Sequence, residues 1–415
     1  MIHLTPEAFL YILLAIVVFD FIIEQVLDYL NLSTDNRSIP PSVKEYYDND
    51  KYRQTINYQR TRTRFSFVTS SLSFVASVAI LYFGGFGWLD QLVRSFVNNP
   101  ILLALIYFGV LAILSDLLTL PFQLYHTFVI EERFGFNKTT LTTFIADKIK
   151  GYLLGILFGG SIMAALIYLI LSMGNDFWIY FLAVVVVYML LANMFYSSLI
   201  LPLFNKLTPL EEGSLKAAIE SYSRKVGFPL DNIYVIDGSK RSNKANAFFT
   251  GLGKKKKIVL YDTLINNNAE DELVAILAHE VGHFKKKHIL FGFLIAIIQV
   301  GIMLFIMSTI IFNENLSLAL GADVMGIHLN LIAFGLLYSP ISKITGIVSN
   351  IISRKNEFEA DAYAAETYNA QALSNALKKL SVDNLSYLYP HPAYVFVHHS
   401  HPPLLQRLGA LGELK

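Results

Sequence analysis

Cysteine is absent from the 415-residue chain, which excludes disulfide bonds, thiolate metal ligands and a cysteine nucleophile. Charge is also scarce, because charged residues make up 16% of the chain whereas hydrophobic residues make up 54%, and the mean hydropathy is +0.48. A water-soluble protein keeps more charge on its surface, so this balance indicates a protein that is dissolved in lipid. The formal net charge of +1 provides no overall field for nucleic acid, and no nucleic-acid partner is expected.

Long apolar runs account for this composition. Seven runs are each close to the roughly 20 residues that a helix needs to cross a bilayer. They cover approximately residues 8–30, 66–88, 100–122, 151–173, 177–201, 289–312 and 328–351. The first run is too long for the core of a cleaved signal peptide and no basic region precedes it, so it is interpreted as a retained span. The sequence therefore predicts an all-α multi-pass membrane protein with seven transmembrane helices.

Basic residues indicate the orientation of these spans. All but two of the 33 Lys and Arg residues follow spans 1, 3, 5 and 7, and the two exceptions are Arg94 and Lys343. Because basic loops stay in the cytosol, the N-terminus is predicted to lie outside and the C-terminus in the cytosol. This arrangement fits a bacterial inner membrane or an endoplasmic reticulum membrane.

Residues 268–287 are predicted to form one helix that carries two histidines. Asn268 can cap its start, acids in its first turn suit the positive end of the helix dipole, and lysines at 285–287 suit the negative end. His279 and His283 are four residues apart, so both imidazoles leave the same face and can bind one metal ion.

The residue after the first histidine is Glu280, which can reach a water on that metal. A zinc-bound water has a pKa of about 7, and a carboxylate can take its proton as the water attacks a peptide carbonyl. The pattern His279-Glu280-Val-Gly-His283 is therefore typical of zinc proteases. A chance match, a structural metal site and a plain surface pair are the alternatives that the pattern leaves open.

A catalytic zinc needs a third protein ligand and one open position. The best candidate is Glu357, 74 residues beyond His283 in a stretch that is predicted to be a second helix. Asp361 shares the face of Glu357 and can accept a hydrogen bond from a ligand histidine, which fixes its tautomer. Glu359 points about 200° away from Glu357 on an ideal helix and is the less favoured ligand. The alternative for this stretch is a solvated acidic face.

The chain is divided into four parts on this basis. They are 1–201 with spans 1 to 5 and their cytosolic loops, 202–288 with the two-histidine helix, 289–352 with spans 6 and 7, and 353–415 with the third candidate ligand. Neither cytosolic part has an obvious complete core, so we expect the two to pack together as one small, mainly helical zinc-protease domain. Residues 232–237 and 257–262 have the alternation or β-branched content of strands and predict a short β element in it.

Several segments together resemble one family. The two-histidine motif and Asn356-Glu-Phe-Glu-Ala-Asp361 resemble the integral-membrane CAAX prenyl protease 1 family of zinc metalloproteases. The other matching segments are Val129–Asn137, Leu201–Gly213, Lys244–Gly251 and His401–Arg407. The resemblance spans nearly the whole chain in order. It implies a barrel of seven long helices around a water-filled chamber, with zinc near the cytosolic end.

The same resemblance implies the roles of the metal-site residues. His279, His283 and Glu357 are implied to be the ligands of one Zn²⁺ ion, and Glu280 is implied to be the general base. The implied activity is a zinc-dependent endopeptidase that cleaves near the C-terminus of CAAX-type substrates, prenylated or not. The expected partners are a peptide or lipidated peptide and membrane lipid.

The resemblance also places two residues at the substrate backbone. They are Asn246 and His401, either of which can donate a hydrogen bond to the developing oxyanion. Arg407 is a candidate for orienting acidic side chains in the site. From the residues alone, His401 and the histidines before it read as a polar loop. Two alternative functions remain at this point, a quality-control protease for membrane proteins and a non-hydrolytic zinc-bound transporter or scaffold.

Overall fold

The computed structural model describes residues 4–34, 37–250 and 256–412. The apolar runs form long helices, because lipid offers no hydrogen-bonding partners and a helix satisfies its backbone groups internally. Six continuous helical stretches of the described chain are long and apolar enough to cross a membrane. The helices in these stretches include α1 (Pro6–Leu32), α2 (Asn49–Tyr82), α4 (Pro100–Tyr125), α5 (Leu141–Leu154), α6 (Gly160–Met173), α7 (Phe177–Phe195), α8 (Leu201–Phe204), α12 (His288–Ile310), α14 (Ile327–Ala364) and α15 (Ala370–Asp383).

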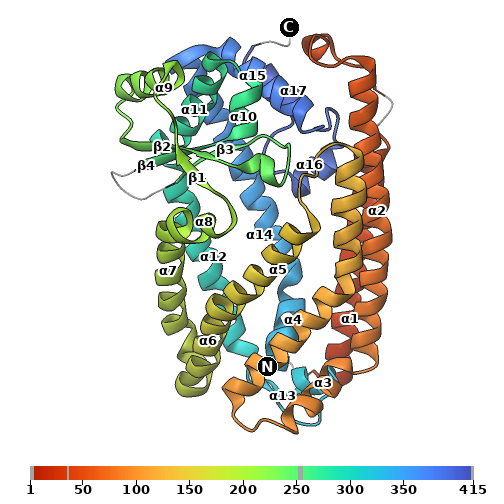
Figure 1. Ribbon diagram of the computed structural model, residues 1–415. Helices are drawn as coiled ribbons and strands as arrows, with labels where there is room; N and C mark the ends of the chain where they lie inside the picture. The colour runs from red at the N-terminus through yellow and green to blue at the C-terminus, as the bar shows by residue number, and fades with distance from the viewer. Residues whose placement is uncertain (1–3, 35–36, 251–255, 413–415) are drawn as a thin grey trace.

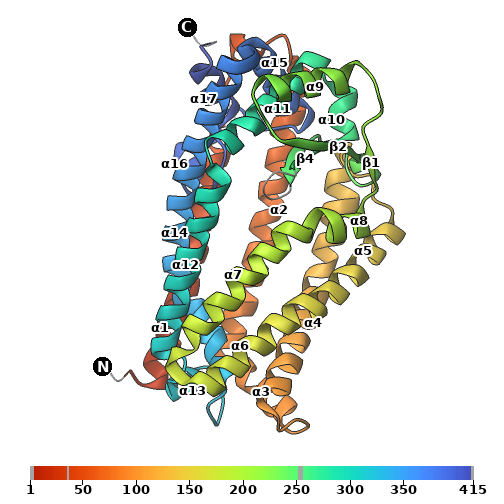
Figure 2. The ribbon, with the colours of Figure 1, turned by 90° about the vertical axis from the view of Figure 1, so that its left-hand side faces the viewer.

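One of these stretches, Leu141–Phe204, contains two of the seven predicted spans. A short turn, Gly174–Asp176, separates α6 from α7 inside it. Gly174 has a φ of 55°, a conformation that side chains disfavour, so the chain reverses there and α6 and α7 pack side by side (Figure 2). The mainly helical, multi-pass fold is confirmed, while the number of seven crossings stays a prediction.

The predicted end of the second span is wrong. Residues 66–88 predict one continuous span, but α2 ends at Tyr82 and a separate helix, α3 (Gly85–Arg94), follows it. The break lies at Gly84, whose φ is 68°. Hydropathy extends the span too far because the residues beyond the break are also apolar, and an apolar average does not detect a left-handed turn. At its other end α2 begins well before the predicted span, at Asn49.

The two ends of the molecule are built differently. Helices α9 (Ser214–Lys225), α10 (Asp262–Asn267), α11 (Glu270–Lys285), α15 and α17 (Leu404–Ala410) lie at one end with the sheet, and α3 and α13 (Glu314–Ala319) lie at the other (Figure 1). The helices leave a cavity of ≈ 1000 Å³. Side chains of α2, α4 and the segment after α16 (Pro392–His398) line it, among them Arg62, Ser66, Gln123, His401 and Arg407. The cavity corresponds to the chamber of the predicted fold class.

Acidic residues inside the long helices are paired. Lys343 Nζ on α14 lies 3.2 Å from Asp20 Oδ1 and 3.0 Å from Glu24 Oε1, both on α1. Asp116 on α4 pairs with Lys148 on α5 at 2.5 Å. An uncompensated charge in a bilayer is costly, so these pairs allow acids to remain in helices that are otherwise apolar.

The β element is a four-stranded sheet rather than the two strands that were predicted. The strands are β1 (Leu207–Pro209), β2 (Leu230–Ile236), β3 (Ala247–Thr250) and β4 (Lys256–Tyr261), in the order β1-β2-β4-β3. Strands β2 and β4 match the predicted runs 232–237 and 257–262 and pair in parallel. Strands β1 and β3 were missed because three or four residues are too few to show alternation. Strand β3 lies at an edge of the sheet.

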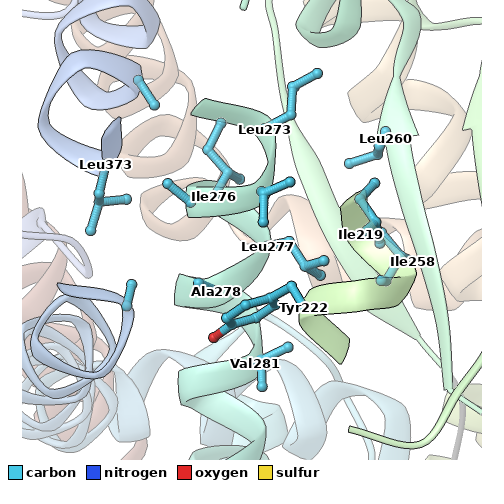
Figure 3. Packing of buried hydrophobic residues seen from close by; sticks show 14 of the residues in the cluster. Ile219, Tyr222, Ile258, Leu260, Leu273, Ile276, Leu277, Ala278, Val281 and Leu373 are labelled. Carbon is cyan, nitrogen blue, oxygen red and sulfur yellow. The ribbon is translucent and has the colours of Figure 1, made fainter. Parts of the chain in front are cut away.

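Helix α11 lies at the centre of the core at the sheet end. Its residues Leu273, Leu277 and Val281 pack with Ile219 of α9, Ile258 and Leu260 of β4, and Leu373 of α15 (Figure 3). These contacts join residues before α12 to residues after α14. A helix that is buried on most sides is held firmly, which matters because α11 carries both motif histidines.

Candidate metal centre and active site

The predicted two-histidine helix is α11, and its first turn differs from the prediction. Asn268 does not cap it, because the helix begins after Ala269 and the Asn268 side chain donates to Leu264 O instead, at 2.9 Å. Glu272 closes the helix start by accepting a hydrogen bond from Ala269 N at 2.7 Å, and Lys379 on α15 pairs with the same carboxylate at 2.6 Å. This pairing ties the start of α11 to a later part of the chain.

Helix α14 brings the third candidate ligand to α11. The predicted second helix around Glu357 is the last part of α14, which continues unbroken from the apolar run before it. The two helices approach closely at Gly282, where an added Cβ would lie 3.0 Å from Ala360 Cα. A larger residue at 282 would separate the helices, so this glycine sets the spacing between the histidines and Glu357.

The structure brings the three predicted ligands together. The Nε2 atoms of His279 and His283 lie 3.2 Å apart. Glu357 Oε2 lies 3.4 Å from the former and Glu357 Oε1 lies 3.3 Å from the latter. Among the described residues, these three form a group whose ligand atoms all lie within 4.8 Å of one another.

The chemistry of this group fits a divalent metal. Glu357 Oε2 is buried and accepts no hydrogen bond within the described ranges. Two cationic groups lie at ion-pair distance from it, His279 Nε2 at 3.4 Å and Arg407 Nη1 at 3.6 Å. Two imidazole nitrogens and one carboxylate oxygen form the ligand set of many catalytic zinc sites, with a fourth position open. A metal ion between the three side chains would place a closer positive charge against this oxygen.

Asp361 and Arg407 support His279 on the side of the ring that faces away from the other two candidate ligands. Asp361 Oδ1 lies 2.8 Å from His279 Nδ1, and Arg407 donates to both oxygens of Asp361, at 2.8 and 2.6 Å. Burial disfavours the charged imidazolium of His279, but the carboxylates of Asp361 and Glu357 outweigh it and raise the pKa of His279 to about 9. Burial also opposes the charge of Arg407, but Asp361 outweighs it and raises the pKa of the guanidinium. The positions predicted for Asp361 and Arg407 are thus adjacent to the ligand cluster.

Glu280 lies beside the cluster and is available for proton transfer. No hydrogen bond of its side chain occurs within the described ranges. Burial raises the pKa of Glu280, and the nearby histidines partly offset this. A carboxyl whose pKa is shifted towards neutrality is suited to accept and return a proton near pH 7.

The two residues expected at the substrate differ in position. His401 Nε2 lies 3.3 Å from Glu357 Oε1, and its ring is largely exposed, on the cavity wall. The ring faces the cavity, but the protein atoms around it replace part of its hydration and lower the pKa of His401, so the neutral ring is favoured. Asn246 precedes the edge strand β3 and is exposed, and its Oδ1 accepts from Ala247 N at 2.9 Å. In the part of the chain that the structure describes, no hydrogen bond or ion pair joins Asn246 to the ligand cluster.

Sequence reasoning missed His288 beside His283, and it considered Glu359 only as the less favoured ligand. The Nδ1 atoms of His283 and His288 lie 3.0 Å apart, and His288 Nε2 lies 3.1 Å from Glu359 Oε2. The available signal was a third histidine five residues beyond the motif. It could not be used because Lys287, with a φ of 61°, separates α11 from α12, and helical spacing does not continue through that break.

Two family descriptions match nearly the whole chain. Residues 28–206 match "CAAX prenyl protease N-terminal, five membrane helices", and residues 209–415 match "Peptidase family M48". The CAAX prenyl protease 1 homolog of Arabidopsis thaliana is 36% identical over 401 residues, which cover 94% of each chain. The CAAX prenyl protease 1 of Saccharomyces cerevisiae is 35% identical over 399 residues, which cover 90% of this chain and 88% of the relative.

A solved structure is similar as well. The crystal structure of S. mikatae Ste24p superimposes with a TM-score of 0.93 at 33% identity and covers 97% of this chain and 99% of that chain. The fold and these matches define a multi-pass membrane metalloendopeptidase. The chain belongs to the CAAX prenyl protease 1 family, within peptidase family M48. The predicted family and enzyme class are confirmed, and the family implies a metal and a peptide substrate.

Proposed function

We propose that this protein is a zinc-dependent endopeptidase that cleaves near the C-terminus of CAAX-type substrates, prenylated or not. The observation that carries the proposal is the convergence of His279, His283 and Glu357, with the buried Oε2 of Glu357, which accepts no hydrogen bond among the described residues, and the carboxyl of Glu280 beside it. The names of the relatives, which are CAAX prenyl proteases, support the substrate class.

In the proposed mechanism His279, His283 and Glu357 hold the zinc. When bound, zinc supplies Lewis acidity that polarises the scissile carbonyl and makes water acidic enough to attack near neutral pH. Glu280 accepts the proton of the attacking water and returns it to the leaving amine. Asp361, clamped by Arg407, keeps the Nδ1 of His279 engaged, so that Nε2 faces the metal position.

Two further residues act on the substrate in this proposal. His401 lies against Glu357 at the cavity wall, where its ring can donate a hydrogen bond to the developing oxyanion. Asn246 lies at the start of the edge strand β3 and holds the substrate backbone. Removing one oxyanion donor typically costs about 10²–10³ in rate.

The cavity suits a substrate with two different ends. Its wall combines polar side chains with aromatic ones, such as Phe65 and Phe122, beside helices that contact lipid. We propose that the peptide part extends to the metal centre, while the apolar prenyl group, where the substrate has one, lies against the aromatic wall or in the lipid phase.

The proposed orientation places the N-terminus outside and the metal centre in the cytosol. The four-part division of the chain at 201, 288 and 352 follows from that orientation, and the eukaryotic relatives favour the endoplasmic reticulum over a bacterial inner membrane.

The decisive experiment compares substrates and one conservative variant. The purified full-length protein in detergent is expected to cleave a farnesylated CAAX peptide, and to cleave it faster than an unmodified, unfolded membrane protein. The Glu280→Gln variant is expected to retain zinc and to cleave about 10²–10⁴-fold more slowly, because the amide cannot accept the proton of the attacking water. Cleavage by Glu280→Gln at the wild-type rate would contradict the mechanism, and a preference for the unfolded membrane protein would favour a quality-control protease.

A further inference from the structure

His283 is supported by a chain of hydrogen bonds that differs from the support of His279. His288 is the first residue of α12 and is buried, with 8% of its surface exposed. One of its ring nitrogens lies 3.0 Å from His283 Nδ1 and the other lies 3.1 Å from Glu359 Oε2. Three elements, α11, α12 and α14, therefore meet through His283, His288 and Glu359.

The direction of this hydrogen-bond chain follows from the proposed metal site. The Nε2 of His283 faces His279 and Glu357, so it must keep its lone pair to bind a metal. The ring proton of His283 then lies on Nδ1 and is donated to His288 Nδ1. His288 in turn carries its proton on Nε2 and donates it to Glu359, whose carboxylate can only accept. This single arrangement of protons gives His283, His288 and Glu359 each a hydrogen-bond partner, with both imidazoles neutral.

We propose that His288 and Glu359 are positioning residues, which fix the tautomer and ring orientation of His283 so that its Nε2 binds the metal. The inference rests on the zinc site proposed above. It assigns to Glu359 a part in the site that is not that of a ligand, because its carboxylate reaches the metal position only through two imidazoles. Partners of this kind typically change metal affinity by about 10–100-fold when they are lost.

The bend at Lys287 makes this support possible. Lys287 has a left-handed backbone, which a residue with a side chain rarely adopts. It ends the helical course of α11 and starts α12 in a new direction, so that His288 turns back to His283. The contact between His288 and His283 thereby connects the start of α12 to the proposed metal centre.

The test measures zinc affinity and stability, not only cleavage. Full-length protein in detergent is stripped of zinc and titrated with Zn²⁺ against a chromogenic chelator, and the melting temperature is recorded before and after zinc addition. His288→Leu and Glu359→Leu are expected to weaken zinc binding by about 10–100-fold. Glu359→Gln is expected to stay within a few-fold of the wild type, because the Gln oxygen still accepts from His288. The melting temperature of the zinc-free form is expected to be nearly the same in all three variants.

A matched control removes the other partner of Glu359. Lys355 Nζ lies 3.7 Å from Glu359 Oε1 and its side chain is 78% exposed, so Lys355→Gln is expected to leave zinc affinity unchanged. Wild-type zinc affinity in His288→Leu would overturn the inference, as would equal losses in Glu359→Gln and Glu359→Leu. A lower zinc-free melting temperature with unchanged zinc affinity would show a purely structural role and also overturn it. The proposed function fails separately, if the wild-type protein binds no zinc or Glu280→Gln cleaves normally.

Discussion

Two buried triads of the same composition lie at opposite ends of the molecule. At the metal end, Asp361 accepts from Arg407 and contacts His279 Nδ1 at 2.8 Å. At the other end, Asp90 on α3 accepts from Arg94 at 3.1 and 2.9 Å, and His328 Nε2 lies 2.8 Å from its Oδ1. Helix α17, which carries Arg407, and helix α3, which carries Asp90 and Arg94, are far apart in both views (Figures 1 and 2).

The difference lies in the second nitrogen of each histidine. The second nitrogen of His279, Nε2, faces His283 and Glu357. The ring of His328 instead packs against Tyr107, with centroids 4.6 Å apart, and against Gly326, where an added Cβ would lie 2.8 Å from the ring. The two triads therefore differ in one respect. The second ring nitrogen of His279 faces the other candidate ligands, whereas the ring of His328 is closed off by Tyr107 and Gly326. The triad of His328 joins α3 to the start of α14.

The largest expected effect is that of Asp361→Ala. The substitution removes the carboxylate that hydrogen-bonds the buried Arg407 guanidinium and leaves it only Glu357, 3.6 Å away, which costs up to about 3–5 kcal/mol. It also frees the ring of His279, so zinc affinity is expected to fall about 10–100-fold. Thermal unfolding and zinc titration against a chelator measure the two effects. If Asp361→Ala bound zinc as tightly as the wild type, the triad of His279 would have no part in metal binding that the triad of His328 lacks.

A smaller and purely structural effect is expected from Asp90→Ala. It leaves a buried histidine and a partly exposed arginine without an acceptor, so the free energy of unfolding is expected to fall by about 1–3 kcal/mol. Zinc affinity is expected to stay at the wild-type value, since this triad has no link to the metal ligands in the described structure. Gln91→Ala on the same helix removes an exposed hydrogen bond to Asp323 and serves as the control with little effect. A loss of zinc affinity in Asp90→Ala would show that the two ends are coupled.

The third expected effect is a pH dependence that belongs to the ligand cluster. The pKa of His279 is about 9 in the metal-free protein, raised from 6.5. The stability that this group contributes to the metal-free protein is thus fully present below pH 6.5 and is lost as the pH rises through 9. Because zinc must displace the proton, zinc affinity is expected to increase from pH 7 to 9, by at most about tenfold per pH unit. Titrations at several pH values measure this slope, and Asp361→Ala should reduce it because the group that raises the pKa is gone.

Much of the metal centre could be predicted from sequence because helical spacing is a local rule. His279 and His283 share a face of α11, and Glu357 and Asp361 share a face of α14, and the structure places these faces together. The position of His401 came from the family resemblance alone, since a run of histidines in a loop has no periodic signal. His288 was missed because the turn at Lys287 interrupts the period on which such reasoning depends.

Long-range pairing accounts for most of what the sequence could not reveal. The triad at the far end joins Asp90 to His328, which are 238 residues apart, and neither lies in a recognisable motif. The close approach of Gly282 to Ala360 likewise depends on two helices that are separated by a membrane helix. Hydropathy predicted the apolar helices well, but it placed the end of α2 beyond the left-handed turn at Gly84.

Helix α14 holds a member of each triad, His328 near its start and Asp361 near its end. Its 38 residues span about 57 Å, with Pro340 inside the helix, where one backbone hydrogen bond is lost. Glu357 and Asp361 lie one turn apart on the same side of that proline, so any displacement of this last part of α14 would carry both carboxylates together.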